Sequence, residues 1–119
     1  DINQLSGATS SIVLRYSNRE KILTNSDLHS AIVIGKAIFS DICVNAPYAS
    51  RSHANLEFRR GKFVLIDHST NGTYVRFDDK ENLFIRREEL PLLGNGVISL
   101  GEIFTEDGSS TISFSIIQR

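Results

Sequence analysis

Two short polar stretches carry most of the residue types that could do chemistry in this sequence. Residues 50–53 read Ser-Arg-Ser-His, and residues 69–73 read Ser-Thr-Asn-Gly-Thr. Together they offer hydroxyls, a guanidinium, a carboxamide and a glycine that frees backbone N–H groups. These groups suit the binding of an oxyanion, and phosphate is a common biological oxyanion. We therefore predict that the two stretches form one anion-binding site.

Both stretches fall at the ends of expected β-strands. The first precedes residues 54–58, where apolar and polar residues alternate, and the second follows the apolar run of residues 63–66. Alternation with a period of two is typical of a strand with one face in water. Loops at strand ends can hold exposed polar groups on a rigid sheet, so this placement favours a binding site.

The remaining pattern also favours strands. They are expected at residues 12–16, 20–24, 31–34, 41–44, 73–77, 82–86, 97–101 and 112–117. Residues 87–93 are ambiguous, because they allow a helical turn at their start that Pro91 limits, and residues 94–96 (Gly-Asn-Gly) signal a turn. Turn signals return about every 8–12 residues, and no stretch keeps a helical period. The sequence therefore predicts an all-β sandwich.

Length and charge narrow the class of protein. We expect residues 1–11, which are mostly polar or small, to be a linker or a frayed end, and residues 12–119 to form a single domain with its own core. A formal net charge of −1 makes nucleic acid a poor candidate partner. No apolar stretch approaches the ~20 residues of a membrane-spanning helix, so no membrane insertion is expected.

Cysteine and methionine usage bear on the cellular context. Cys43 is the only cysteine, so no internal disulfide can form, which fits a reducing, cytoplasmic location. Its setting between Ile42 and Val44 predicts a small, buried apolar residue. The chain has no methionine, even at position 1, so we expect a module cut from a longer polypeptide.

Four groups of residues, in this order and spacing, resemble a forkhead-associated (FHA) domain. They are Gly35-Lys36, residues 50–53, residues 67–73 and residues 96–101, within a match of roughly residues 32–101. The resemblance implies a module that binds phosphothreonine-containing proteins or peptides through loops at one end of a sandwich of about eleven mostly antiparallel strands. It implies no catalysis, no cofactor and no metal.

Residues 74–77, 83–90 and 98–101 are also similar to FHA domains attached to bacterial class III nucleotide cyclases. This narrower resemblance implies a larger signalling protein that carries a cyclase or another signalling domain.

The resemblance also implies roles for individual residues. Ser50 aligns with the serine whose hydroxyl donates to the phosphate, and Arg51 with a basic position beside it. Thr70 aligns with a residue that contacts the phosphothreonine region. Asn71 aligns with the asparagine that bonds the peptide backbone, a task that suits an amide because it both donates and accepts. Tyr48, at a loop position that helps to choose residues after the phosphothreonine, suggests an apolar or mixed preference.

The resemblance implies that other residues support the binding loops without contacting the ligand. His53 aligns with a structural histidine that braces the loops, Gly72 permits the turn that presents Asn71, and Gly35 supports the loops at the end of its strand. Lys36 departs from the family, which usually has an arginine that contacts the phosphate. Lysine keeps the charge but lacks the planar fork, so either the affinity is lower or Arg51 takes a larger share of the binding.

Two other functions are compatible with parts of the sequence. The first is a phospho-independent interaction or assembly domain, in which Lys36 marks a weakened phosphate pocket. The second is a hydrolase triad drawn from Ser50, Ser52, His53, Asp67 and His68. No nucleophile-elbow pattern surrounds these residues, which disfavours the enzyme. The histidines His29, His53 and His68 lack the spacing of a metal site.

Overall fold

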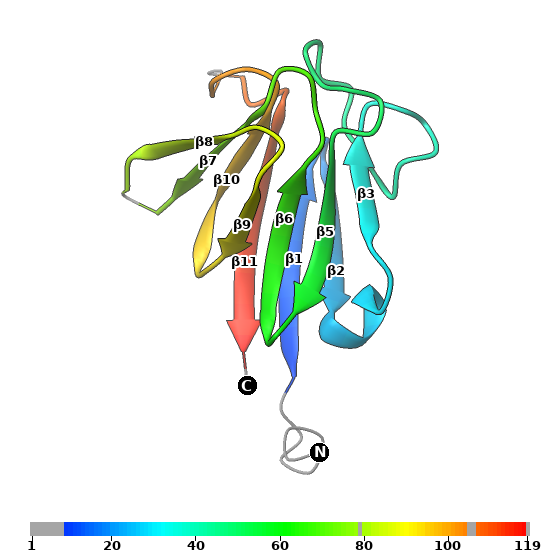
Figure 1. Ribbon diagram of the computed structural model, residues 1–119, viewed down its shortest axis with the longest axis vertical. Coiled ribbons are helices and arrows are strands. Elements are labelled where there is room, and N and C mark those ends of the chain that lie inside the picture. Colours follow the sequence, from blue (N-terminus) through cyan, green and yellow to red (C-terminus); the bar gives the residue numbers. More distant parts are fainter. Residues whose placement is uncertain (1–8, 79, 105–106, 119) are drawn as a thin grey trace.

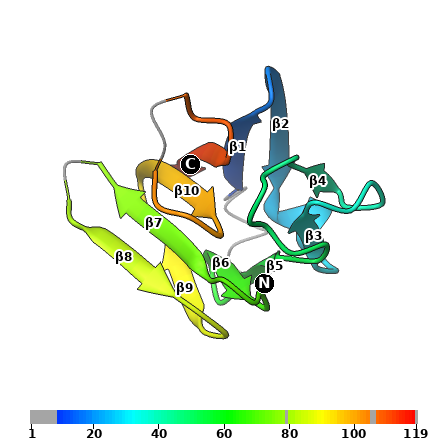
Figure 2. The ribbon, with the colours of Figure 1, turned by 90° about the horizontal axis from the view of Figure 1, so that it is seen from above.

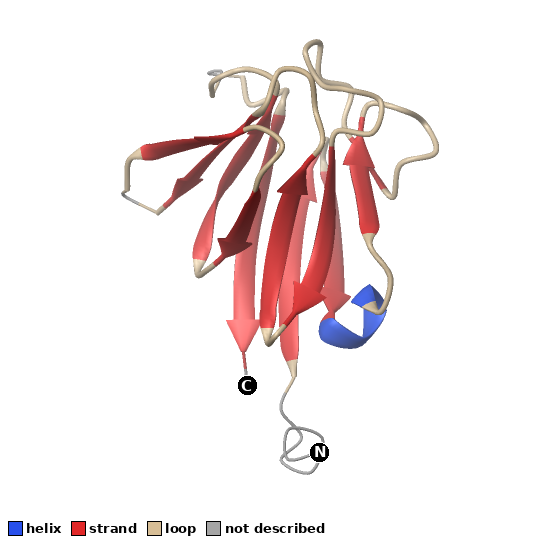
Figure 3. Ribbon diagram, viewed as in Figure 1, coloured by secondary structure: helices blue, strands red, loops and turns tan. Residues whose placement is uncertain are grey.

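The computed structural model describes residues 9–78, 80–104 and 107–118, which form two β-sheets packed face to face (Figure 1). The strands are β1 (Ser10–Tyr16), β2 (Arg19–Thr24), β3 (Ile32–Gly35), β4 (Ile42–Cys43), β5 (Ala54–Arg59), β6 (Lys62–Asp67), β7 (Thr73–Phe77), β8 (Asn82–Ile85), β9 (Glu89–Leu92), β10 (Asn95–Leu100) and β11 (Thr111–Gln118). Within the described residues the one helical element is a 3₁₀ turn, η1 (Asn25–Leu28), blue in Figure 3. The all-β prediction is confirmed.

The strands pair mostly antiparallel. The six-stranded sheet has the order β2-β1-β11-β10-β7-β8, and the five-stranded sheet has the order β4-β3-β5-β6-β9. Only the short β3–β4 pair is parallel among the pairs of the described strands. Antiparallel sheets can bury one face and leave the other in water, which is how the alternating residues of β5 are placed.

The two inner faces share one hydrophobic core. The largest fully buried side chains are Phe63, Phe114, Ile12, Leu14, Ile34, Ile42, Leu56, Leu65, Leu92, Ile98, Leu100 and Ile112. In β5, Ala54 and Leu56 are buried and Phe58 packs against this core, as the alternation predicted. Because residues from both sheets and from both ends of the chain meet in one core, the sandwich is held as a unit.

Strand pairing decided the segments that the sequence left ambiguous. Residues 89–92 form β9 against β6 and not a helical turn, with Leu92 buried. Pro91 is tolerated because β9 is an edge strand, where a missing N–H does not break a ladder on both sides. Strand β10 already begins at Asn95, so the expected turn is shorter than predicted. Strand β1 begins at Ser10, inside the segment expected to be a linker, of which residues 1–8 lie outside the described part.

The prediction for Cys43 was wrong, because its side chain is exposed. The period of two sends the side chains of Ile42 and Cys43 to opposite faces of the sheet, and Ile42 takes the buried one. The Cys43 thiol lies 3.7 Å from the Lys36 carbonyl oxygen, to which it can donate a weak hydrogen bond.

Loops gather at one end of the sandwich. The β3–β4, β4–β5, β6–β7, β8–β9 and β10–β11 connections lie together at the upper end in Figure 1, and Figure 2 looks down on that end. Strand β1 begins and β11 ends at the opposite end. Among the residues that the structure describes, no helix is long and apolar enough to cross a membrane.

Candidate functional site

The structure brings the two polar stretches into direct contact at the loop end. Residues 50–53 belong to the β4–β5 loop, and residues 69–72 form most of the β6–β7 loop. The Ser50 Oγ accepts a hydrogen bond from the Thr70 N–H at 3.1 Å. Because this contact uses a lone pair of the oxygen, the Ser50 hydroxyl proton remains available to another acceptor.

His53 lies buried beneath both loops and joins them. Its Nδ1 accepts the Ser50 N–H at 3.0 Å, and a backbone amide can only donate, so the ring proton sits on Nε2. Nε2 lies 3.0 Å from the Gly72 carbonyl oxygen and 2.9 Å from Thr73 Oγ1. Burial lowers the pKa of His53 below its ordinary value, although the Asp67 carboxylate and the Gly72 hydrogen bond oppose the shift. His53 is therefore a neutral brace between the loops.

Asp67, at the end of β6, is the acceptor on which the β6–β7 loop closes. Its Oδ1 accepts the N–H groups of Ser69 at 2.9 Å and of Arg87 at 3.0 Å. Its Oδ2 accepts the hydroxyls of Thr73 and of Ser69, the latter at 2.8 Å. Burial by itself raises the pKa of Asp67, but these hydrogen bonds outweigh it and hold the pKa below its ordinary value. The carboxylate is thus ionised and ties β6, β7 and the β8–β9 connection together.

The Ser69 hydroxyl also accepts the Gly72 N–H at 2.7 Å, which closes the turn behind Asn71. Gly72 has a φ of +86°, a conformation that favours glycine. Asn71 itself is exposed, and its Nδ2 donates to the Tyr48 carbonyl oxygen at 3.0 Å. That bond fixes the carboxamide across the gap between the β4–β5 and β6–β7 loops.

The β10–β11 loop supports the same junction through Gly101. Its N–H donates to the Gly72 carbonyl oxygen at 3.0 Å, and its φ is +81°. A Cβ on Gly101 would come 2.1 Å from the Tyr48 carbonyl oxygen, the atom that Asn71 bonds. Only a residue without a side chain fits between these groups.

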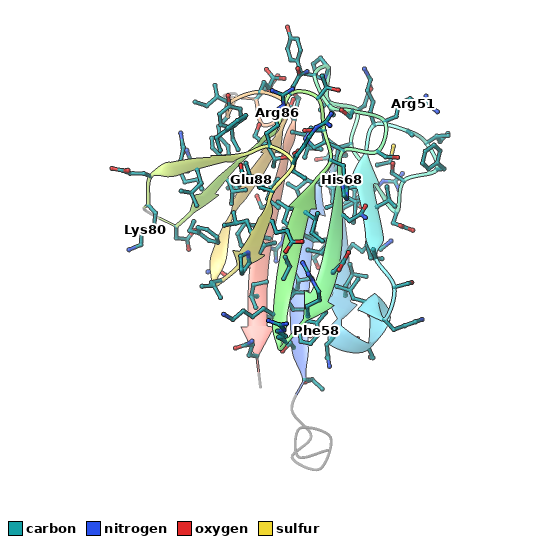
Figure 4. All side chains as sticks on the ribbon, viewed as in Figure 1. Arg51, Phe58, His68, Lys80, Arg86 and Glu88 are labelled. Carbon is teal, nitrogen blue, oxygen red and sulfur yellow. The ribbon has the colours of Figure 1, made fainter. Side chains whose placement is uncertain are left out.

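Two exposed cations, Lys36 and Arg51, belong to the same loop end as Ser50. Lys36 follows Gly35, and its N–H donates to the Ser50 carbonyl oxygen at 3.0 Å. Gly35 permits this approach, because a Cβ there would come 2.1 Å from the Arg51 carbonyl oxygen. The side chains of Lys36 and Arg51 are exposed, and within the described part of the chain neither forms an ion pair. Figure 4 shows Arg51 at the loop end, far from Phe58 at the other end.

The arrangement does not form a hydrolase triad. His53 and Asp67 lie 3.7 Å apart, but the group of Ser50 that contacts the imidazole is the backbone N–H and not the hydroxyl. Both ring nitrogens are engaged and the ring is fully buried, so neither nitrogen can take a proton from Ser50. Ser52 and His68 are exposed. Among the described residues, no three His, Cys, Asp or Glu side chains gather as a metal site.

The sequence patterns included four residues of this assembly without assigning their supporting roles: Asp67, Ser69, Thr73 and Gly101. The Asp-x-Ser spacing of residues 67–69 is the signal of a turn in which the carboxylate accepts an N–H two residues on, so it could have been detected. The contact between Gly101 and Tyr48 joins residues far apart in the chain, and no local pattern marks it.

A model of the FHA domain family matches residues 32–101 of this chain, which is more than half of it. The chain belongs to the FHA family. Similar solved structures include the first FHA domain of Mycobacterium tuberculosis Rv1747, with a TM-score of 0.66 and 21% identity over 90% of this chain and 96% of that chain. An FHA domain of an Arabidopsis thaliana protein has a TM-score of 0.63 and 21% identity, over 89% and 83% of the two chains.

The first FHA domain of yeast Rad53 has a TM-score of 0.63 and 17% identity, over 99% of this chain and 85% of that chain. No curated protein matches the sequence. At these identities the likeness to solved structures concerns the fold, so the chemistry of this FHA domain must be argued from its own residues.

We predict that Gly101→Ala destabilises this FHA domain more than Gly61→Ala does. Gly61 has a matching φ of +79°, but nothing lies within 4 Å of its added Cβ. Gly61→Ala should therefore cost about 1 kcal/mol of unfolding free energy, from backbone strain alone. Gly101→Ala adds a clash with the Tyr48 carbonyl and should cost about 2 kcal/mol or more. Urea unfolding of both variants measures the difference, and equal losses would contradict the packing described here.

The buried His53 predicts a loss of stability in acid. Its pKa is lower in the folded than in the unfolded protein, so the unfolded chain takes up the proton first as the pH falls below about 6.5. The free energy of unfolding should be constant above that pH and fall below it, and the lowered pKa of Asp67 adds a further loss at more acidic pH. Urea unfolding across this range should show a shallower decline for His53→Gln. Parallel declines for the two proteins would argue against a buried neutral imidazole.

Proposed function

We propose that this FHA domain binds phosphothreonine-containing proteins or peptides at its loop end, with no turnover and no cofactor. One observation carries the proposal. The Ser50 oxygen already accepts the Thr70 N–H, and Ser50 adjoins two exposed cations: the Lys36 N–H bonds the Ser50 carbonyl, and Arg51 is the next residue in the chain. Neither cation has an ion-pair partner within the described residues. A phosphate dianion accepts short, charge-assisted hydrogen bonds from hydroxyl and cationic N–H groups.

Asn71 suits the backbone of such a peptide. One Nδ2–H is held by the Tyr48 carbonyl, which leaves the second N–H and the Oδ1 of an exposed carboxamide for the ligand. A donor and an acceptor on one fixed group can pair with the C=O and N–H of an extended chain. Thr70, also exposed, lies next to the Ser50 hydroxyl and is assigned to the phosphothreonine itself.

Preformed loops favour this function, because they reduce the ordering cost of binding. The two site loops are fixed in the unbound domain by three features. The His53 imidazole accepts the Ser50 N–H, the Asp67 carboxylate accepts the Ser69 N–H, and Gly101 lies close against the Tyr48 carbonyl. His53, Gly35 and Gly72 are therefore proposed as supports of the loops and not as ligand contacts.

Similar solved structures lend support by analogy. One was described in an analysis of phosphothreonine-dependent FHA domain interactions, with a TM-score of 0.60 and 22% identity. Another is Mycobacterium tuberculosis EmbR in complex with a low-affinity phosphopeptide. These descriptions concern those proteins, and the proposal for this chain rests on its own site residues.

The wider context is part of the proposal. We infer that this domain belongs to a cytoplasmic, bacterial signalling protein. The resemblance of residues 83–90 to FHA domains of class III cyclases suggests a nucleotide cyclase as the neighbouring domain. The full reading frame tests this inference, because it either encodes a cyclase domain or does not.

We predict that Ser50→Ala and Asn71→Ala each weaken phosphothreonine-peptide binding by about ten- to a hundredfold, the loss expected when a hydrogen bond to a charged or buried group is removed. Ser52→Ala is the matched control, since Ser52 is an exposed serine of the same loop. Titrations would use a phosphothreonine peptide library, its unphosphorylated twin and a phosphoserine twin, with unfolding curves to verify the fold. Binding that ignores phosphorylation would instead identify a phospho-independent assembly domain, and release of product from a test ester would identify an enzyme.

Lys36 predicts an affinity below what an arginine would give. Lys36→Arg should tighten phosphopeptide binding by about two- to tenfold, because a planar guanidinium can donate two parallel hydrogen bonds to the phosphate. Lys36→Gln should weaken binding by a similar factor and reduce its dependence on ionic strength. Fluorescence anisotropy at two salt concentrations measures both. If neither substitution changes the affinity, Arg51 supplies the positive charge by itself.

A further inference from the structure

The β3–β4 loop presents two apolar side chains to solvent beside the phosphate contacts. Ile38 is 94% exposed and Phe39 is 63% exposed, and the two are neighbours in sequence. Single exposed apolar residues are common on protein surfaces, but an adjacent pair at a loop end concentrates apolar surface in one place. The hydrogen bonds of this turn and its contact with Arg51 connect the pair to the proposed phosphate site.

This loop is held in one conformation by its ends. The Ser40 N–H donates to the Ala37 carbonyl oxygen at 2.9 Å, which closes a turn with Ile38 and Phe39 at its centre. Ala37 and Ser40 are themselves buried, at 3% and 8% exposure. The turn therefore anchors its two flanks and projects its two central side chains.

The turn is hydrogen-bonded to Arg51 of the β4–β5 loop. The Arg51 carbonyl oxygen accepts both the Ala37 N–H at 3.1 Å and the Ser40 hydroxyl at 3.3 Å. The Arg51 guanidinium also lies over the Phe39 ring, 5.8 Å from its centroid, within the range of a cation–π contact. The apolar pair is thus continuous with the cation proposed to contact the phosphate.

We propose that Ile38 and Phe39 form a docking contact for an apolar side chain of the phosphopeptide, and so restrict the ligands of this domain to phosphothreonine sequences with an aliphatic or aromatic residue near the phosphothreonine. The inference rests on the proposed function. Ser50 contacts Thr70, the chain neighbour of Asn71, and is itself followed by Arg51, so the apolar pair adjoins the site through Arg51 and Asn71 adjoins it through Thr70. Figure 2 shows the β3–β4 connection at one margin of the loop end.

The chemistry of the pair fits such a ligand better than an acidic one. An exposed apolar side chain gains free energy when another apolar group covers it, and a preformed turn loses little entropy on doing so. In the proposed complex the Arg51 guanidinium pairs with the phosphate, so it is not free to bind an acidic side chain of the peptide. An acidic residue would find no donor on the side chain of either Ile38 or Phe39.

The test compares the wild-type domain with Ile38→Ser and with Leu93→Ser, using a peptide library that is fixed at phosphothreonine and degenerate at the flanking positions. Leu93 is a matched control, because it is an apolar residue of a turn, 60% exposed, between β9 and β10 at the opposite end of the sandwich. Ile38→Ser removes a side chain that is almost fully exposed, so the fold should be unaffected. Binding of a phosphothreonine peptide flanked only by glycine reports the phosphate contacts alone.

We expect the wild type and Leu93→Ser to enrich aliphatic or aromatic residues at one flanking position, and Ile38→Ser to lose that enrichment. For the best selected peptide, Ile38→Ser should weaken binding by about five- to twentyfold, the effect of uncovering one aliphatic side chain. The glycine-flanked peptide should bind all three proteins equally. Equal enrichment in all three proteins, or enrichment of acidic residues, would overturn the docking contact alone. A wild-type domain that binds no phosphothreonine peptide would overturn the proposed function as well.

Discussion

The ionised carboxylate of Asp67 is the group on which the loop end of this FHA domain depends. It is almost fully buried, and it accepts hydrogen bonds from the chain at Ser69, Thr73 and Arg87. A buried charge without partners would cost several kcal/mol, whereas one with all of its acceptor positions used can be retained in the interior. Because the donors come from three different segments, the same bonds that stabilise the charge also fix where those segments lie. The β6–β7 loop therefore has one conformation before any ligand arrives.

The imidazole of His53 extends this constraint to the second loop. Its two nitrogens connect the Ser50 amide to the Gly72 carbonyl and the Thr73 hydroxyl, and Thr73 in turn donates to Asp67. Among the described residues, no buried side-chain nitrogen or oxygen lacks a hydrogen-bond partner. A network that is completely satisfied in this way is rigid, because every rotation breaks a bond that no water can replace. The proposed ligand contacts at Ser50 and Asn71 are thus positioned by the buried His53 imidazole and the buried Asp67 carboxylate, neither of which is proposed to touch the ligand.

The exposed surface over this network carries cationic and apolar side chains. The cations Lys36 and Arg51 are exposed and have no ion-pair partner among the described residues, and Arg51 adjoins the apolar pair of Ile38 and Phe39. A solvated cation keeps its hydration until a ligand displaces it, so it attracts anions from a distance without destabilising the fold. In the proposed complex, the two cations attract the phosphate and the apolar pair selects the flanking residue, so that affinity and selectivity come from different atoms of one loop end.

Local pattern and motif spacing were enough to predict most of the strands, the all-β class, the FHA family and the two polar loops, but they left β9 ambiguous. The tertiary structure decided what depends on strand register. It placed Ser50 against Thr70, residues 20 apart in the chain, and it made Asp67 an anchor through the Arg87 amide, again 20 residues away. It also turned Cys43 outward, because only pairing decides which of two alternating residues faces the core. Local composition identifies candidate phosphate contacts, and long-range hydrogen bonds decide which of these candidates lie together at the loop end.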